Sequence, residues 1–227
     1  MKLKKIVSLA LAGILAVSML TACDSKSNNG NSGDVPPESN AMAGIAATLT
    51  EKVDLDKIKF SASNELDNAL ISAIGNVGTG SIAAIYDANG MNSVQFVDNT
   101  HANTVLRTVA MDLIDDLESE NFGNEGNVAG AMGKLTPSAA NQWDDDLNVT
   151  VLYVVNSGVE VENALAGIAN NMDNALKGLQ LDNEAVNNVT TQRYTYSGAV
   201  SVYSKIATED HGKGLTFIAV QVTRNLA

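Results

Sequence analysis

Cysteine is nearly absent from this chain of 227 residues, in which Cys23 is the only one. A chain with one cysteine can form no internal disulfide, so the stability of a folded domain must come from packing. Aromatic residues are also scarce, at 4% of the sequence. The core is therefore expected to consist mainly of Val, Ile, Leu, Ala and Met side chains.

Histidine is the next shortage, with His101 and His211 as the only two. A zinc site needs further Cys, His or carboxylate ligands at a recognisable spacing, and a catalytic triad needs a nucleophile within reach. The G-x-S-x-G and H-E-x-x-H motifs do not occur in the sequence. The sequence therefore favours surface histidines and assigns no catalytic residue.

Basic residues are outnumbered, with 14 Lys and Arg against 26 Asp and Glu, which gives a net charge of −12. Nucleic acid is excluded as a partner because its phosphates demand Lys and Arg. One glycine motif, Gly78-Thr-Gly80-Ser-Ile-Ala83, matches the G-x-G-x-x-A fingerprint of dinucleotide sites. That fingerprint needs a strand before it and a helix after it, whereas we expect the reverse order here. We therefore expect a loop and no cofactor.

The first 23 residues have the order of an export signal. Three lysines among the first five residues are followed by an apolar run over residues 6–20. About fifteen residues are too few to span a hydrocarbon core of roughly 30 Å, so we expect a cleaved signal and not a membrane helix. The residues that end it, Leu20-Thr21-Ala22-Cys23, resemble the lipobox of bacterial lipoproteins.

This resemblance implies that the Cys23 thiol is joined to diacylglycerol and that residues 1–22 are removed. The expected location is the outer face of the bacterial cytoplasmic membrane or the cell surface. Removal leaves 227 minus 22, or 205, residues, and the loss of three lysines takes the net charge from −12 to −15. Because such an acidic protein is repelled by anionic lipid, two acyl chains must supply the membrane affinity.

The exported chain divides into a tether and one domain. Residues 23–40 contain the lipidated Cys23 and a stretch of Ser, Asn and Gly with one Pro36-Pro37 pair, which is typical of a flexible polar linker. Apolar periodicity begins at Ala41. Residues 41–227 have the length of a single domain with a sizeable core, so we expect one acidic domain there.

Apolar residues recur at helical spacing in several segments of this domain. Helices are expected over residues 42–53, from an Asn64 N-cap to residue 77, over 100–120, and over 161–179 after a capping box formed by Ser157 and Glu160. Residues 123–133 are expected to form a loop. A shorter helix is expected to begin at Thr136-Pro137 and to place Trp143 on an apolar stripe, as a core residue.

Three further regions have the pattern of strands. Residues 81–86 and 93–97 are expected to pair around an Asn89-Gly90 turn. Residues 149–155 are apolar on both faces and are expected to form the central strand, whereas 193–205 and 215–224 alternate as a hairpin with one buried face. Together these elements predict an α+β fold of two layers, in which helices cover one face of a mixed, mostly antiparallel sheet of about five strands.

Acidic side chains offer the candidate metal sites. Asp112, Asp115 and Asp116 crowd the C-terminal half of a predicted helix, where the helix dipole disfavours negative charge, so a cation or a basic partner could relieve them, as could water. A calcium loop starting at Asp87 would need an oxygen ligand at Met91 and a glycine at Asn92, so it fails.

These observations leave three hypotheses for the exported domain. The first is a membrane-anchored domain without catalytic activity that binds a ligand or a protein partner. The second is a cell-surface hydrolase that uses a carboxylate pair, in which Trp143 could stack on sugar. The third is a cation-binding lipoprotein that uses the helix acids. The absence of catalytic motifs favours the first hypothesis.

Overall fold

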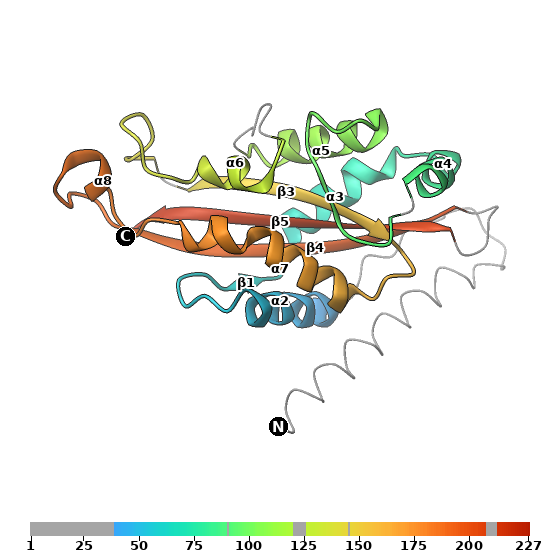
Figure 1. Ribbon diagram of the computed structural model, residues 1–227, viewed down its shortest axis with the longest axis horizontal. Coiled ribbons are helices and arrows are strands. Elements are labelled where there is room, and N and C mark those ends of the chain that lie inside the picture. Colours follow the sequence, from blue (N-terminus) through green and yellow to red (C-terminus); the bar gives the residue numbers. More distant parts are fainter. Residues whose placement is uncertain (1–38, 90, 120–125, 145, 208–212) are drawn as a thin grey trace, which may run out of the picture.

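A computed structural model of the chain describes residues 39–89, 91–119, 126–144, 146–207 and 213–227. The signal segment, Cys23 and most of the tether lie outside these residues. Five strands form a single sheet in the order β1-β4-β5-β3-β2 (Figure 1). The strands are β1 (Phe60–Ser61), β2 (Gln95–Val97), β3 (Leu147–Asn156), β4 (Tyr194–Ile206) and β5 (Gly214–Leu226). The helices are α2 (Ser39–Val53), α3 (Asn64–Gly75), α4 (Thr79–Asn89), α5 (Thr104–Asp116), α6 (Val128–Gly133), α7 (Val161–Lys177) and α8 (Glu184–Asn187).

The sheet is mixed and mostly antiparallel, as the sequence predicts. β4 and β5 form a long hairpin, and β5 also pairs antiparallel with β3 along all ten residues of β3. β2 is antiparallel to β3, and only the two-residue β1 is parallel to its neighbour, β4. The α+β class and the pairing of the predicted C-terminal hairpin are therefore confirmed, whereas its expected single buried face is wrong, since consecutive residues of β5 are buried. The middle position belongs to β5, however, and not to the expected strand at 149–155.

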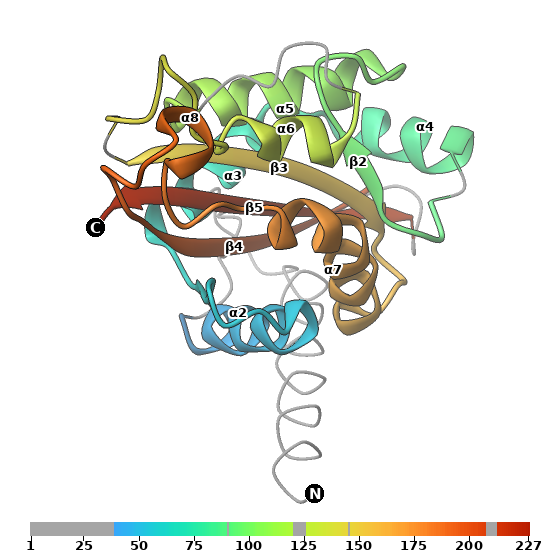
Figure 2. The same ribbon diagram turned by 60° about the vertical axis from the view of Figure 1, so that its left-hand side comes forward.

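Helices cover both faces of the sheet, which corrects the expected two-layer arrangement. Alternate side chains of β5 enter two separate cores: Ile218 and Val220 enter one, and Phe217 and Ala219 enter the other. The first core contains residues of α2, α6 and α7, and the second contains residues of α3, α4 and α5 (Figures 1 and 2). A strand buried on both faces needs a helical layer on each, because its apolar residues cannot all point one way.

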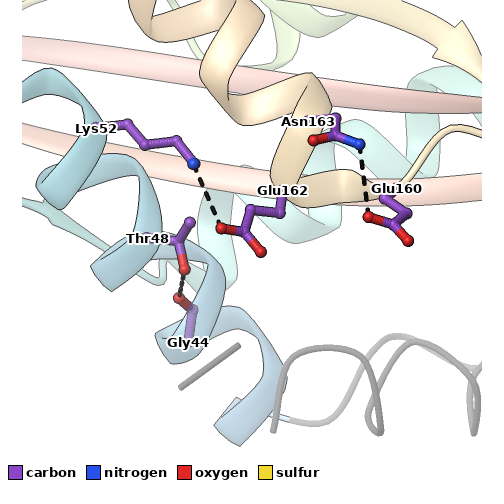
Figure 3. A network of polar contacts seen from close by, with 6 residues as sticks. All are labelled: Gly44, Thr48, Lys52, Glu160, Glu162 and Asn163. Carbon is purple, nitrogen blue, oxygen red and sulfur yellow. Dashed lines mark hydrogen bonds and ion pairs between the residues drawn. The ribbon is translucent and has the colours of Figure 1, made fainter. Parts of the chain in front are cut away.

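Two helices pack side by side on the first face. α2 and α7 present buried stripes to each other, including Leu49 and Leu165, both of which are fully buried. At their rim Lys52 Nζ lies 3.5 Å from Glu162 Oε1 (Figure 3). This ion pair is partly exposed, and such pairs contribute at most about 1 kcal/mol. Apolar burial therefore holds the two helices together.

The expected strand at residues 81–86 is a helix, α4. Ile82 and Ile85 are both buried in the second core, and a helix places residues three apart on one side. In a strand these two side chains would point to opposite faces. A short apolar run has no period long enough to distinguish the two structures, and tertiary packing decides. The fifth strand of the sheet is instead β1, which the sequence pattern missed.

Several helix ends also differ from expectation. Ser63, and not Asn64, caps α3, since its side chain accepts a hydrogen bond from Leu66 N. The capping box at the start of α7 is absent: Glu160 is the N-cap without a side-chain cap bond, and its carboxylate accepts from Asn163 Nδ2 (Figure 3). α6 lies inside the expected loop at 123–133.

Replacing Tyr153 by phenylalanine should stabilise the domain. Tyr153 is fully buried on β3, its hydroxyl has no hydrogen-bond partner among the described residues, and burial holds its pKa far above the ordinary value. Burying a hydroxyl without a partner costs about 1–3 kcal/mol. The edge-on contact with Phe96 needs only the ring. We expect about 1 kcal/mol of added stability and a Tm raised by about 2–4 °C in thermal unfolding.

Tyr196→Phe is the matched control for this substitution. The Tyr196 hydroxyl donates a hydrogen bond to Gln180 O at 2.5 Å, so its removal should cost about 1 kcal/mol. A Tm that falls in Tyr153→Phe as much as in Tyr196→Phe would show that the Tyr153 hydroxyl has a partner.

Candidate functional site

Two loops lie next to each other at one end of the domain. The first end loop, residues 136–146, of which all but residue 145 are described, leads from α6 toward β3, and the second end loop, residues 180–193, contains α8 and leads into β4. Figures 1 and 2 both show them projecting side by side beyond the sheet, near the end of β5. Neither loop could be placed from the sequence, because their proximity results from the order of strands in the sheet.

A buried arginine supports the first end loop. Arg224 on β5 is fully buried. Its Nη1 donates to Leu135 O at 2.9 Å, and its Nη2 donates to Asn141 O. The guanidinium carbon also lies 4.6 Å from the centre of the Tyr194 ring, a cation–π contact. The helix expected to begin at Thr136-Pro137 is absent, since the described residues 136–144 form turns. Arg224 binds Asn141 O, a carbonyl that such a helix would have used in its own hydrogen bonds.

A network of amide side chains joins the two loops. Gln142 Oε1 accepts hydrogen bonds from Asn183 Nδ2 at 2.8 Å and from Asn187 Nδ2. Asn183 is fully buried, and its Oδ1 accepts from the backbone N–H groups of Thr191 and Gln192. A buried amide with both ends satisfied fixes one arrangement of the surrounding chain. The second end loop is therefore held in a defined shape although it has little regular structure.

Two tyrosines of β4 fasten the bases of the loops. The Tyr194 hydroxyl donates to Gln142 O at 2.9 Å, and the Tyr196 hydroxyl donates to Gln180 O. Burial raises the pKa of Tyr194, and burial raises the pKa of Tyr196 to about 12. Both hydroxyls therefore remain protonated donors across the physiological pH range. Each end loop has at least one such bond to the sheet.

The outer surface of these loops is apolar. Trp143, Leu181 and Val189 are 56%, 53% and 59% exposed, and they are the large hydrophobic side chains found exposed in the described part of the chain. Single exposed apolar residues need no explanation, but a group of them marks an interaction site. All three lie on the two end loops, so we call these three residues the end patch.

An open depression adjoins the end patch. It has a volume of about 550 Å³ and is lined by Gln180, Leu181, Asp182, Glu184, Ala185 and Asn188. Asp182 Oδ1 accepts a hydrogen bond from Glu184 N, which fixes the turn that carries both carboxylates. Leu181 belongs to both the depression and the end patch. The surface therefore combines apolar contact area with carboxylate and amide groups.

Negative charge surrounds this surface. The two end loops contain five acidic residues and one basic residue, Arg193. Of the acids, Asp144, Asp146 and Glu184 are exposed. Asp144, Asp146, Asp182 and Glu184 take part in none of the ion pairs between described residues, which include Lys52–Glu162, Lys177–Asp173 and Lys213–Asp87. These four carboxylates are therefore available to a partner.

Comparison with known proteins gives no guide to the site. No protein family, no curated protein and no solved structure matches the chain.

The helix acids of the cation hypothesis remain on the surface. Asp112, Asp115 and Asp116 are exposed on α5. Within the described ranges, no group of three or more His, Cys, Asp and Glu side chains is close enough to hold a metal ion. These three carboxylates are therefore exposed to solvent.

The other motifs have structural roles. Asp87 lies on α4 and pairs with Lys213 at 3.0 Å, and the buried Asp98 accepts from Thr100 N. His101 Nδ1 accepts from Asn103 N just before α5, whereas His211 lies outside the described residues. Gly80 and Ala83 belong to α4, and the element before them is the helix α3, so the strand that a dinucleotide site needs is missing at this point.

Trp143 is the clearest correction at the site. The sequence pattern predicts a core residue, whereas the side chain is more than half exposed on a turn. The expected stripe needed a helix that does not form. The amide network of Gln142 and Asn183 was also missed, since the two residues are far apart in sequence and no local pattern marks buried amides.

Among the described helices, no single one is long and apolar enough to cross a membrane. By length and composition, α3 and Thr79–Ala88 of α4 are long and apolar enough only when they are taken together, as a pair bent by 90°.

Proposed function

We propose that this protein is a lipid-anchored extracytoplasmic binding protein without catalytic activity, and that its two end loops recognise the partner. The export signal and Cys23 support the anchor, and the end patch supports the recognition surface. The observation that carries the proposal is the joint exposure of Trp143, Leu181 and Val189 on loops that buried side chains hold in place. A domain gains nothing in stability from exposing these side chains.

A hydrolase is less well supported by the same surface. Asp182 and Glu184 are two carboxylates in one depression, as glycoside hydrolysis requires. A general acid, however, must be buried among apolar groups to keep its proton at neutral pH. Glu184 is exposed in an open depression, so its carboxylate is surrounded by water. The arrangement favours binding over proton transfer.

Cys23→Ser should release the protein from membranes. A serine hydroxyl cannot form the thioether to diacylglycerol, and the domain has no other anchor in this proposal. We expect the wild-type protein in the membrane fraction after a carbonate wash and the Cys23→Ser protein in the soluble fraction, measured by immunoblot of fractionated cells. Ser25→Ala is the matched control and should stay in the membrane fraction. Retention of Cys23→Ser after the wash would refute the anchor.

A further inference from the structure

We infer that the end loops bind a segment of a cationic polypeptide, with its apolar side chains on the end patch and its Lys or Arg side chains beside the depression. This inference rests on the proposed function and specifies the partner of the same surface. Three features of the described residues carry it: apolar exposure, unpaired negative charge, and a fixed loop geometry.

The apolar part of the surface suits side chains of a protein. Trp143 supplies a large ring with few rotatable bonds, and tryptophan is enriched among the residues that contribute most to protein interfaces. Leu181 and Val189 add aliphatic surface, which the hydroxyl groups of a sugar would not complement. Leu181 also forms part of the depression wall, so one apolar side chain of the partner can contact it there.

The charge of the surface determines the charge of the partner. The depression is lined by Asp182 and Glu184 and by no basic residue. The exported chain carries a net charge of −15 after the loss of residues 1–22, so it attracts cations over long range and repels anionic lipid and anionic glycans. Lys or Arg of the partner would find carboxylates that no described ion pair occupies.

The loops meet the partner in a form that is already ordered. Asn183 and Arg224 are both fully buried and hold the second and first end loops, respectively, by hydrogen bonds to backbone groups. A binding surface that is ordered in advance avoids the entropic cost of ordering loops on association. Trp143 and Leu181 are therefore exposed on loops that already have the shape in which a partner would meet them.

A selection with random linear peptides displayed on phage tests the inference on the full-length protein. We expect the selected peptides to be enriched in Lys or Arg next to Leu, Ile, Phe or Met. Trp143 is the only tryptophan, so its fluorescence emission reports binding directly and should shift when a selected peptide covers it. Affinities of the variants follow from calorimetry with the same peptide.

Two sets of variants separate the apolar and the charged contributions. Leu181→Ser combined with Val189→Ser should weaken binding at least about tenfold, in the range found for buried interface residues. Asp182→Asn combined with Glu184→Gln should weaken binding about three- to tenfold and reduce its dependence on salt. Asp182→Asn keeps the oxygen that accepts from Glu184 N, so the turn should persist.

The matched control removes the same charge elsewhere. Asp112→Asn combined with Asp116→Asn deletes two exposed carboxylates from α5 and should change the affinity less than about twofold. An equal loss of peptide affinity in the two charge variants would show that the cation does not contact the carboxylates of the depression. A selection that yields no peptides, or peptides without basic enrichment, would overturn the inference as a whole.

A panel of neutral oligosaccharides, tested in parallel by calorimetry, which needs no tryptophan signal, distinguishes the other class of ligand. Binding of an oligosaccharide that Trp143→Ala abolishes would overturn the polypeptide inference while leaving a recognition surface in place. The anchor is tested separately by Cys23→Ser, so the failure of the peptide selection and the failure of the proposed anchoring are distinct results.

Discussion

Arg224→Met should lower the free energy of unfolding by about 3 kcal/mol and release the first end loop. Methionine matches the apolar stem of arginine but cannot donate to Leu135 O and Asn141 O. Hydrogen bonds to a charged group contribute about 1.5–3 kcal/mol each, and the cation–π contact with Tyr194 adds to them. Removing the cost of burying a charge offsets part of this loss.

Urea unfolding and amide hydrogen exchange measure the two effects of Arg224→Met. Exchange should accelerate in residues 135–142, whose backbone the guanidinium holds. The Arg224→Lys protein should have a free energy of unfolding between those of the wild type and Arg224→Met, because a single ammonium group cannot span two carbonyls as the guanidinium does. Arg193→Met is the control on the exposed side, with an expected change within about 0.5 kcal/mol. An Arg224→Met protein as stable as the wild type would show that loop and sheet are held by other contacts.

Gly198→Ala should destabilise the edge of the sheet by about 1–3 kcal/mol. Gly198 on β4 lies opposite Phe60 of the two-residue β1. A Cβ atom at position 198 would lie 2.4 Å from Phe60 Cδ1, far inside any van der Waals contact. Phe60 is buried, so its ring has to shift within packed surroundings or leave them. Thermal unfolding should show a lower Tm.

A double-mutant cycle isolates this contact. Phe60→Leu removes the ring atoms that clash, so Gly198→Ala should cost less in the Phe60→Leu background, by about 1 kcal/mol or more. Gly80→Ala is the control for the substitution itself: nothing lies within 4 Å of its Cβ position on α4, and alanine should add about 0.5 kcal/mol there. Additive effects of the two β1–β4 substitutions would contradict the clash.

The long amphipathic helices and the C-terminal hairpin were predictable because local pattern and tertiary packing agree in them. Val161, Leu165, Ile168, Met172 and Leu176 lie on one stripe of α7, and all of them are buried. β4 and β5 are long β-prone runs that follow one another in the chain, so their pairing needs only a short connection. A long periodic segment has few alternative ways to bury its apolar face.

The errors fall where the pattern is short. Residues 81–86 are an apolar run too short to show a period, and the loop at 136–146 has too few apolar positions to show one. Ile82 and Ile85 become a helical pair because the second core accepts both, and Trp143 is exposed on a loop whose Asn141 O is bound by Arg224 of β5. In each case a residue far away in the sequence decides the local structure.

The sequence by itself determined the chemical character of this protein: an acidic domain without disulfides, a core of aliphatic side chains, an α+β class and an expected anchor at Cys23. These properties depend on composition, on periodicity and on a contiguous motif, none of which requires knowing which distant residues meet in space. Only the tertiary structure decided that helices cover both faces and that residues 136–146 and 180–193 meet at one end. Their meeting follows from the strand order, in which β5 lies between β3 and β4, and sequence spacing does not encode that order.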